Sequence, residues 1–329
     1  MKAVVIQAVE HGRPQLAVME LPRPATGPSD LLVAVRAAGI NRADLARATK
    51  HYAHSGPIPE HPAGGLEMAG EVIAVGSEAA GFAVGDRVMA MAQRSFAEFV
   101  AIHHSLVMKV PPALSWEEAG AFPVVYFTAH DALATNAGLA AGESVLIHAV
   151  SGGVGFAALQ IAALKGARPI LGTSGSPDKI AQLKTHGLDH GLDPADGGFA
   201  DAALALTGGR GVDVVIDTVG ATALAGNLRC AANRGRIVGI GRMGGRTAEI
   251  DLDLLASKRL KLIGVTFRTR TLAEHADVVR RFEADLGPAV AAGRLKPVID
   301  RRFALTDAAA AQDYLAANRH LGKVVLTLP

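Results

Sequence analysis

The sequence predicts an α/β protein whose central part is a doubly wound parallel β-sheet. Between residues 126 and 267, short runs of apolar residues alternate with segments of helical periodicity. Strands that are apolar on both faces, each followed by a helix, are what a parallel sheet covered on both sides requires. A glycine-rich turn at residues 150–155 joins one of these apolar runs to a helix, which is a second feature typical of doubly wound sheets.

The chain before this region has the pattern of a mostly β domain. Short extended runs are separated by Gly and Pro, and the Pro-rich stretches read as loops because proline cannot donate to a strand ladder. Ser115 and Glu118 have the spacing of a capping box, which predicts a helix that begins near Trp116. The expected strands are 2–7, 31–38, 67–75, 86–91 and 96–102.

The central region supplies the strands and helices of the parallel sheet. Its expected strands are 144–149, 168–172, 212–218, 236–240 and 260–267, with helices over 154–164, 178–186 and 221–232.

After the central region, a second capping box at Thr271 and Glu274 predicts another helix. A segment at 297–303, a helix near 307–318 and a final strand at 323–328 follow. We find no internal repeat and no low-complexity linker, so we expect the C-terminal residues to return to the first domain. The predicted domains are therefore 126–267 and, together, 1–125 and 268–329.

Composition excludes several classes of protein. The chain has 33 Lys and Arg against 31 Asp and Glu, a net charge of +2, so no overall field favours nucleic acid or an anionic membrane as a partner. Cys230 is the only cysteine, which rules out an internal disulfide and a thiolate-rich metal site. No long apolar run or signal-type N-terminus is present. We expect a cytoplasmic protein with no membrane or nucleic-acid partner.

The glycine turn predicts a dinucleotide site. Residues 145–149 read as a buried strand, and Gly152, Gly153 and Gly155 follow before an apolar-periodic helix. Gly152 and Gly153 would let backbone amides approach a pyrophosphate because they have no Cβ, and Gly155 would let helix and strand pack closely. The N-terminus of the helix adds unpaired N–H groups and a partial positive charge.

The stretch after the next strand favours NADPH over NADH. An NAD site usually has an Asp or Glu about 20 residues beyond the glycines, whereas residues 171–176 contain no carboxylate. Ser174 and Ser176 offer hydroxyls, and Lys179 offers an ammonium that suits a 2′-phosphate. In the alternative interpretation, Ser176 and Pro177 only cap the next helix and Lys179 is a solvated surface residue.

Several motifs along the chain share the pattern of one known family. They lie at 39–45, Tyr52, 64–70, 149–155, 264–267 and 318–329. Together they resemble the zinc-free quinone oxidoreductase, or zeta-crystallin-like, branch of the medium-chain dehydrogenases/reductases, with particular similarity to the tumour-suppressor-inducible type. The resemblance implies a GroES-like β domain completed by the C-terminus, a Rossmann domain, and a cleft between them. It also implies a homodimer built through the last Rossmann strand, about 260–266.

The resemblance also implies roles for individual residues. Asn41 and Leu66 stand where zinc-dependent relatives have a Cys and a His ligand, so no catalytic zinc is expected. Asn41 and Tyr52 are implied to orient nicotinamide and substrate; Thr128 is implied to lie near the nicotinamide, with a core position as the alternative. The implied nucleotide contacts are Tyr52, Gly152, Gly153, Val154, Gly155, Gly175, Lys179, Ile240, Gly241, Arg242, Val265, Thr266 and Phe267.

One departure from the family pattern and two groups of histidines bear on this assignment. Pro194 replaces an aromatic residue or His that flanks the adenosine phosphate in many relatives, which weakens the NADPH preference unless Arg242 compensates. The histidines at 51, 54 and 61 share one Pro-rich loop, where polar surface is the more common role. His103 and His104 are expected to continue the strand of residues 99–102, so we expect their side chains to face opposite ways.

The chemistry without a metal favours quinones. An acceptor that takes hydride without a Lewis acid must itself be electron-poor and conjugated, as quinones and enones are. We therefore expect an NADPH-dependent, zinc-independent quinone oxidoreductase. Two alternatives stay open: an NADPH-dependent enoyl-thioester or enone reductase with Tyr52 as proton donor, and an NADPH-binding protein with little turnover.

Overall fold

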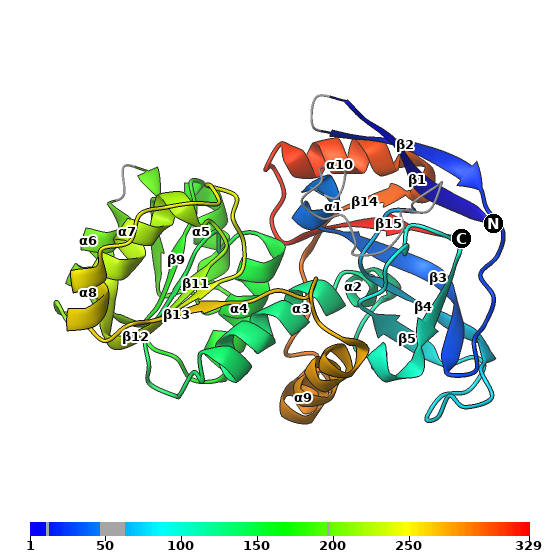
Figure 1. Cartoon of the computed structure of the whole chain (residues 1–329), viewed down its shortest axis with the longest axis horizontal. Coiled ribbons are helices and arrows are strands. Elements are labelled where there is room, and N and C mark those ends of the chain that lie inside the picture. The colour runs from blue at the N-terminus through cyan, green and yellow to red at the C-terminus, as the bar shows by residue number, and fades with distance from the viewer. Residues whose placement is uncertain (11–12, 47–62, 196–197) are drawn as a thin grey trace. The chain divides into compact units, whose positions relative to one another are not determined.

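The computed structural model describes residues 1–10, 13–46, 63–195 and 198–329. The chain forms two compact units, one made of residues 1–127 and 268–329 and the other of residues 128–267 (Figure 1). Within the described ranges, no helix combines the length and the hydrophobicity that a membrane-spanning segment needs.

The first unit is built on a seven-stranded sheet and a separate hairpin, β1–β2. The path through the sheet is β14-β15-β3-β4-β5-β7, and β6 also pairs with β3. The C-terminal strand β15 lies between β14 and β3. The sheet therefore combines strands from both the N-terminal and the C-terminal parts of the chain. The strands are β1 (Lys2–Glu10), β2 (Arg13–Glu20), β3 (Asp30–Ile40), β4 (Met68–Val75), β5 (Arg87–Ala90), β6 (Phe99–His103), β7 (Val107–Lys109), β14 (Ile299–Ala304) and β15 (Lys323–Thr327).

Helices of different lengths accompany this sheet, and both predicted capping boxes are confirmed. The Ser115 hydroxyl accepts from the Glu118 amide and the Glu118 carboxylate accepts from the Ser115 amide; Thr271 and Glu274 make the same pair of bonds. The helical segments are α1 (Arg42–Ala46), η2 (His104–Leu106), α2 (Trp116–Gly120), α3 (Pro123–His130), which runs into the second unit, α9 (Leu272–Ala291), η5 (Leu305–Asp307) and α10 (Ala308–Ala316).

The second unit contains a six-stranded parallel sheet in the order β10-β9-β8-β11-β12-β13. Counted along the chain, this is the 3-2-1-4-5-6 order of the doubly wound fold, in which the strand order reverses between the first and fourth strands. The point of reversal lies between β8 and β11. The strands are β8 (Val145–Ile147), β9 (Ile170–Thr173), β10 (His190–Leu192), β11 (Val212–Asp217), β12 (Ala231–Gly239) and β13 (Lys261–Gly264).

Helices pack on this sheet because its strands are apolar on both faces. Leu146, Leu171 and Ile237 pack in one cluster with side chains of α6, α7 and α8. Val145 and Ile147 alternate with Leu146 and are just as buried, so they face the opposite side of the sheet. The helical segments are the π-helix η3 (Asp131–Asn136), α4 (Gly153–Leu164), α5 (Pro177–Lys184), α6 (Phe199–Leu206), α7 (Ala221–Cys230) and α8 (Leu252–Ser257).

The structure corrects several expectations, among them the extent of two strands and the placement of two histidines. The strand expected at 96–102 begins only at Phe99, and the strand expected at 260–267 ends at Gly264. His103 and His104 do not face opposite ways, because His104 leaves the strand and begins a 3₁₀ turn. Their rings stack with centroids 4.9 Å apart and 25° between the planes.

Candidate functional site

The glycine turn lies directly after β8, at the point where the strand order reverses. Ala149 has a left-handed backbone with φ of 48°, and its carbonyl accepts a hydrogen bond from the Gly152 amide at 2.9 Å. Helix α4 then begins at Gly153 with Gly152 as its N-cap. Because Gly152 has no side chain to cap the helix, the first amides of α4 form the kind of N-terminus that binds anions.

Two glycines of this turn differ in what packing demands of them. A Cβ on Gly155 would lie 2.4 Å from the Ala149 carbonyl oxygen, so α4 approaches the end of β8 only because this residue is glycine. A Cβ on Gly152 would meet nothing closer than 3.4 Å, and its φ of −82° suits any residue. Helix packing therefore explains Gly155 and does not explain Gly152, whose open face suits a ligand.

The other predicted cofactor residues follow the carboxyl ends of neighbouring strands. Ser174 and Gly175 come directly after β9, residues 240–242 after β12, and residues 265–267 after β13. Carboxyl ends of parallel strands lie at one edge of a sheet, where doubly wound proteins bind their ligands. The Ser151 hydroxyl of the glycine turn lies 3.3 Å from the Ser174 hydroxyl, which joins two of these segments.

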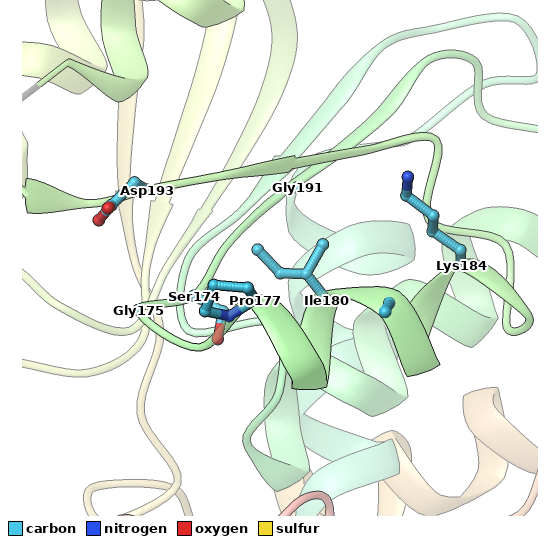
Figure 2. Close-up of a pocket in the computed structure, with 8 residues that line it drawn as sticks. Ser174, Gly175, Pro177, Ile180, Lys184, Gly191 and Asp193 are labelled. Atoms are coloured by element: carbon cyan, nitrogen blue, oxygen red, sulfur yellow. The ribbon is translucent and has the colours of Figure 1, made fainter.

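A cavity of about 350 Å³ lies beside the end of β9 (Figure 2). Ser174 and Gly175 are among its lining residues, and Lys179 is not. Lys184 and Asp193 line it at opposite ends in Figure 2. Sequence analysis missed both, because Lys184 stands two helical turns beyond the serines and Asp193 follows a strand of only three residues.

Ser176 caps α5. Its hydroxyl accepts from the Lys179 amide at 3.4 Å, and Pro177 opens the helix. The capping interpretation of Ser176 is therefore confirmed, while a phosphate contact by Lys179 stays a prediction.

In the first unit, Asn41 belongs to a buried polar cluster that sequence analysis missed. The Lys323 ammonium, at the start of β15, donates to the Glu67 carboxylate at 2.7 Å, to the Asn41 side-chain oxygen at 2.6 Å and to the Ile40 carbonyl at 2.9 Å. The side-chain nitrogen of Asn41 in turn donates to the Glu67 carboxylate at 2.8 Å. Lys323 is 3% exposed and Glu67 0%, so the ion pair lies wholly inside the unit.

This cluster joins segments that are far apart in the sequence. The second oxygen of Glu67 accepts from the Val124 amide at the start of α3 at 2.8 Å. Gly39 leaves room for the carboxylate, since a Cβ there would lie 2.3 Å from it. The one sequence signal was a lysine at the head of an otherwise apolar, buried strand, which calls for a partner of opposite charge.

The residues at this place do not fit a catalytic zinc. Asn41 and Leu66 stand at the two positions where zinc-dependent relatives were expected to have ligands, and the neighbouring Glu67 carboxylate is already paired with an ammonium. All three protons of Lys323 are used by the protein. Among the described residues, no group of three or more His, Cys, Asp and Glu side chains could hold a metal.

Some of the remaining predicted site residues lie in the part of the chain that the structure describes, and others do not. Tyr52 and the histidines at 51, 54 and 61 lie in 47–62, outside the described residues. Thr128 lies in α3 and is buried, so both its predicted role and the core alternative stay open. Cys230 is buried, and burial raises the pKa of its thiol to about 11; at neutral pH it is a protonated core residue.

We expect Lys323→Met to destabilise the protein by about 3–5 kcal/mol, because it leaves the Glu67 carboxylate buried without its counter-charge. The double variant Glu67→Gln/Lys323→Met removes both charges, and we expect it to be more stable than the single variant. Urea denaturation measures both free energies. A loss below about 1 kcal/mol for Lys323→Met would show that the pair is not important for stability.

We expect Gly155→Ala to destabilise the protein by about 1–3 kcal/mol, because the new methyl group overlaps the Ala149 carbonyl. Gly152→Ala is the matched control, and we expect it to cost less than about 1 kcal/mol because that position has space and an ordinary backbone. Thermal unfolding compares the two. Equal losses would contradict the distinction between the two glycines.

Comparisons with known proteins agree with this architecture. The family model described as "Alcohol dehydrogenase GroES-like domain" matches residues 27–112, and the one described as "Zinc-binding dehydrogenase" matches residues 153–283. The predicted combination of a doubly wound parallel sheet and a GroES-like domain is thereby confirmed.

Individual relatives fall into two groups. The chain is 35% identical to a quinone oxidoreductase of Pseudomonas aeruginosa over 98% of both proteins. It is also 36% identical to erythronolide synthase EryA2 of Saccharopolyspora erythraea over 91% of its own length, but it spans only 8% of that synthase.

A solved structure, mycobacterial Rv1454c complexed with NADPH, superposes with a TM-score of 0.89 at 30% identity, over the full length of both chains. Fold, full-length identity and family models agree, and the chain belongs to the quinone oxidoreductase family of the medium-chain dehydrogenases/reductases.

Proposed function

We propose that this protein is an NADPH-dependent, zinc-independent quinone oxidoreductase, which passes hydride from NADPH to quinones or similar electron-poor conjugated carbonyls. The observation that carries the proposal is the glycine turn at the reversal point of the sheet, in a chain 35% identical along its length to a quinone oxidoreductase. The net charge of +2 supports a small-molecule partner rather than nucleic acid.

The residues of the second unit fit the coenzyme in three places. The amides of Gly152, Gly153, Val154 and Gly155 would bind the pyrophosphate, because the open N-terminus of α4 favours negative charge. Ser174, Gly175 and Lys179 would hold the 2′-phosphate, because residues 171–176 lack the carboxylate that an NAD site uses to bind the ribose 2′-hydroxyl. The segments at 240–242 and 265–267 would lie along the remaining, nicotinamide half.

The donors near the reacting ring are amide and hydroxyl groups. When bound, NADPH supplies hydride from C4 of its dihydronicotinamide. Asn41, Tyr52 and Thr128 would orient ring and substrate, and donors aimed at the quinone oxygen would stabilise the charge that develops there. The Asn41 side-chain nitrogen donates to Glu67 at 2.8 Å and, over a longer 3.4 Å, to the Gly39 carbonyl. In this proposal the hydrogen of the longer bond is the one that would turn to a ligand.

A second candidate is reduction of an enoyl thioester, which the similarity to polyketide synthases favours. In that reaction Tyr52 would protonate the α-carbon after hydride reaches the β-carbon. Quinone reduction needs no such donor, since a hydroquinone anion takes its proton from water.

An anaerobic screen of NADPH and NADH oxidation against quinones, enones and a crotonyl thioester tests the proposal. We expect the fastest turnover with NADPH and a quinone, with partial loss in Tyr52→Phe. Lys179→Ala should move the NADPH-to-NADH ratio toward one, because it removes a charge from the 2′-phosphate site. Turnover of the thioester alone, abolished in Tyr52→Phe, would favour the reductase instead.

Gly152→Ala separates coenzyme binding from folding. We expect weaker NADPH binding, measured by the fluorescence of the reduced coenzyme, with thermal stability close to that of the unchanged protein. Unaltered binding would contradict the assignment of this glycine to the pyrophosphate.

We further propose that the protein forms a homodimer through the β13 edge. β13 is the last strand of the sheet, and its residues are mostly exposed, Leu262 at 39%. Met243, Ile250 and Leu252 are also exposed apolar side chains of this unit, and an unpaired apolar edge favours pairing with a second chain.

Leu262→Glu should convert the dimer to a monomer, because a carboxylate would be buried in the paired edge. Sedimentation velocity at several concentrations measures the change. A monomer before substitution, or a dimer that survives it, would contradict the proposed interface.

A further inference from the structure

Beneath the glycine turn lie four buried polar side chains to which no role has been assigned above. We call Thr173, His148, Asn227 and Asp217 the strand-end network. His148 directly follows β8, Thr173 ends β9, Asp217 ends β11, and Asn227 lies in α7. All four are at most 3% exposed, so each polar atom needs a partner inside the protein.

The hydrogen bonds of the network run in one direction. The Asp217 carboxylate accepts from the Asn227 side-chain nitrogen at 3.0 Å, and its other oxygen accepts from the backbone amides of Val219 and Gly220. Asn227 therefore presents its oxygen to His148, whose Nε2 lies 2.7 Å away and must carry the hydrogen.

The same logic continues to the glycine turn. Burial lowers the pKa of His148, so the ring is neutral near pH 7 and its Nδ1 is an acceptor. The Thr173 hydroxyl lies 3.1 Å from Nδ1 and donates to it. This leaves the Thr173 oxygen free to accept from the Ala149 amide, also at 3.1 Å.

Ala149 is the residue on which the shape of the turn depends. It holds a left-handed backbone, which is unfavourable for a residue with a Cβ. Its carbonyl accepts from Gly152 and lies against Gly155. Thr173 holds this part of the turn through two hydrogen bonds. Its hydroxyl accepts from the Ala149 amide, and its backbone carbonyl accepts from the Val150 amide at 3.0 Å.

We propose that the strand-end network positions the glycine turn for the coenzyme pyrophosphate, and that Thr173 and His148 are positioning residues for NADPH binding. This inference rests on the proposed assignment of the turn to NADPH. Thr173 is 2% exposed, so we assign its effect to the Ala149 amide and not to a direct coenzyme contact. A network that served stability alone would leave coenzyme affinity unchanged.

Thr173→Val tests the inference, because valine keeps the shape of threonine and loses only the hydroxyl. We expect the dissociation constant of NADPH to rise about tenfold, as for loss of a hydrogen bond to a buried amide. Thr173→Ser restores the hydroxyl and should return affinity to within about twofold. The readout is coenzyme fluorescence, which does not depend on turnover.

Thr207→Val is the matched control within the same unit. The Thr207 hydroxyl donates to the Ala203 carbonyl and accepts from the Gly211 amide, just before the amino end of β11. Its loss should lower the melting temperature without changing NADPH affinity, because it lies at the opposite end of that strand from Asp217.

The outcomes separate the inference from the proposed function. If the unchanged protein does not bind NADPH, the proposed function fails. If it binds, and Thr173→Val binds equally well while melting at a lower temperature, the inference is overturned. Should Thr173→Val fail to fold, Thr173→Ala and Thr173→Ser differ only by the hydroxyl, and equal affinities for that pair would overturn it as well.

Discussion

The close approach of α4 to the end of β8 is the constraint on which the candidate site depends. At Gly155 the helix backbone lies so near the Ala149 carbonyl that a Cβ would come within 2.4 Å. This contact aims the first amides of the helix beyond the sheet edge, at the point where the strand order reverses. The strand-end network supports the turn from below, so its preorganisation involves residues from three strands and a helix.

In the first unit, a buried ion pair fixes the position of a predicted site residue, Asn41. Lys323 and Glu67 come from segments 256 residues apart, and together they hold the Asn41 amide beside the ends of β3 and α3. A buried pair of this kind contributes less to net stability than its short distances suggest, but breaking it is costly. Its main effect here is to fix the Asn41 side chain, whose nitrogen donates to Glu67 and whose oxygen accepts from Lys323.

The parts of the fold that were predicted correctly from the sequence are those that depend on local sequence patterns. The capping boxes at Ser115 and Thr271 and the strand–glycine–helix order depend on residues close together in the chain. The Lys323–Glu67 pair, the cavity-lining Asp193 and the strand-end network depend on contacts set by strand order, which local spacing does not encode. The stacking of His103 and His104 was not predicted, because the strand was expected to continue through both residues, whereas β6 ends at His103 and a 3₁₀ turn begins at His104.

The candidate site depends on the amides at the start of α4, which we propose bind the coenzyme phosphates. Amide hydrogen exchange, followed by NMR at Gly153, Val154 and Gly155 with and without saturating NADPH, tests this assignment. In the free protein these first-turn amides have no partner within the helix and should exchange rapidly. We expect marked slowing at these amides when NADPH is bound. Unchanged exchange there in a saturated protein would overturn the assignment.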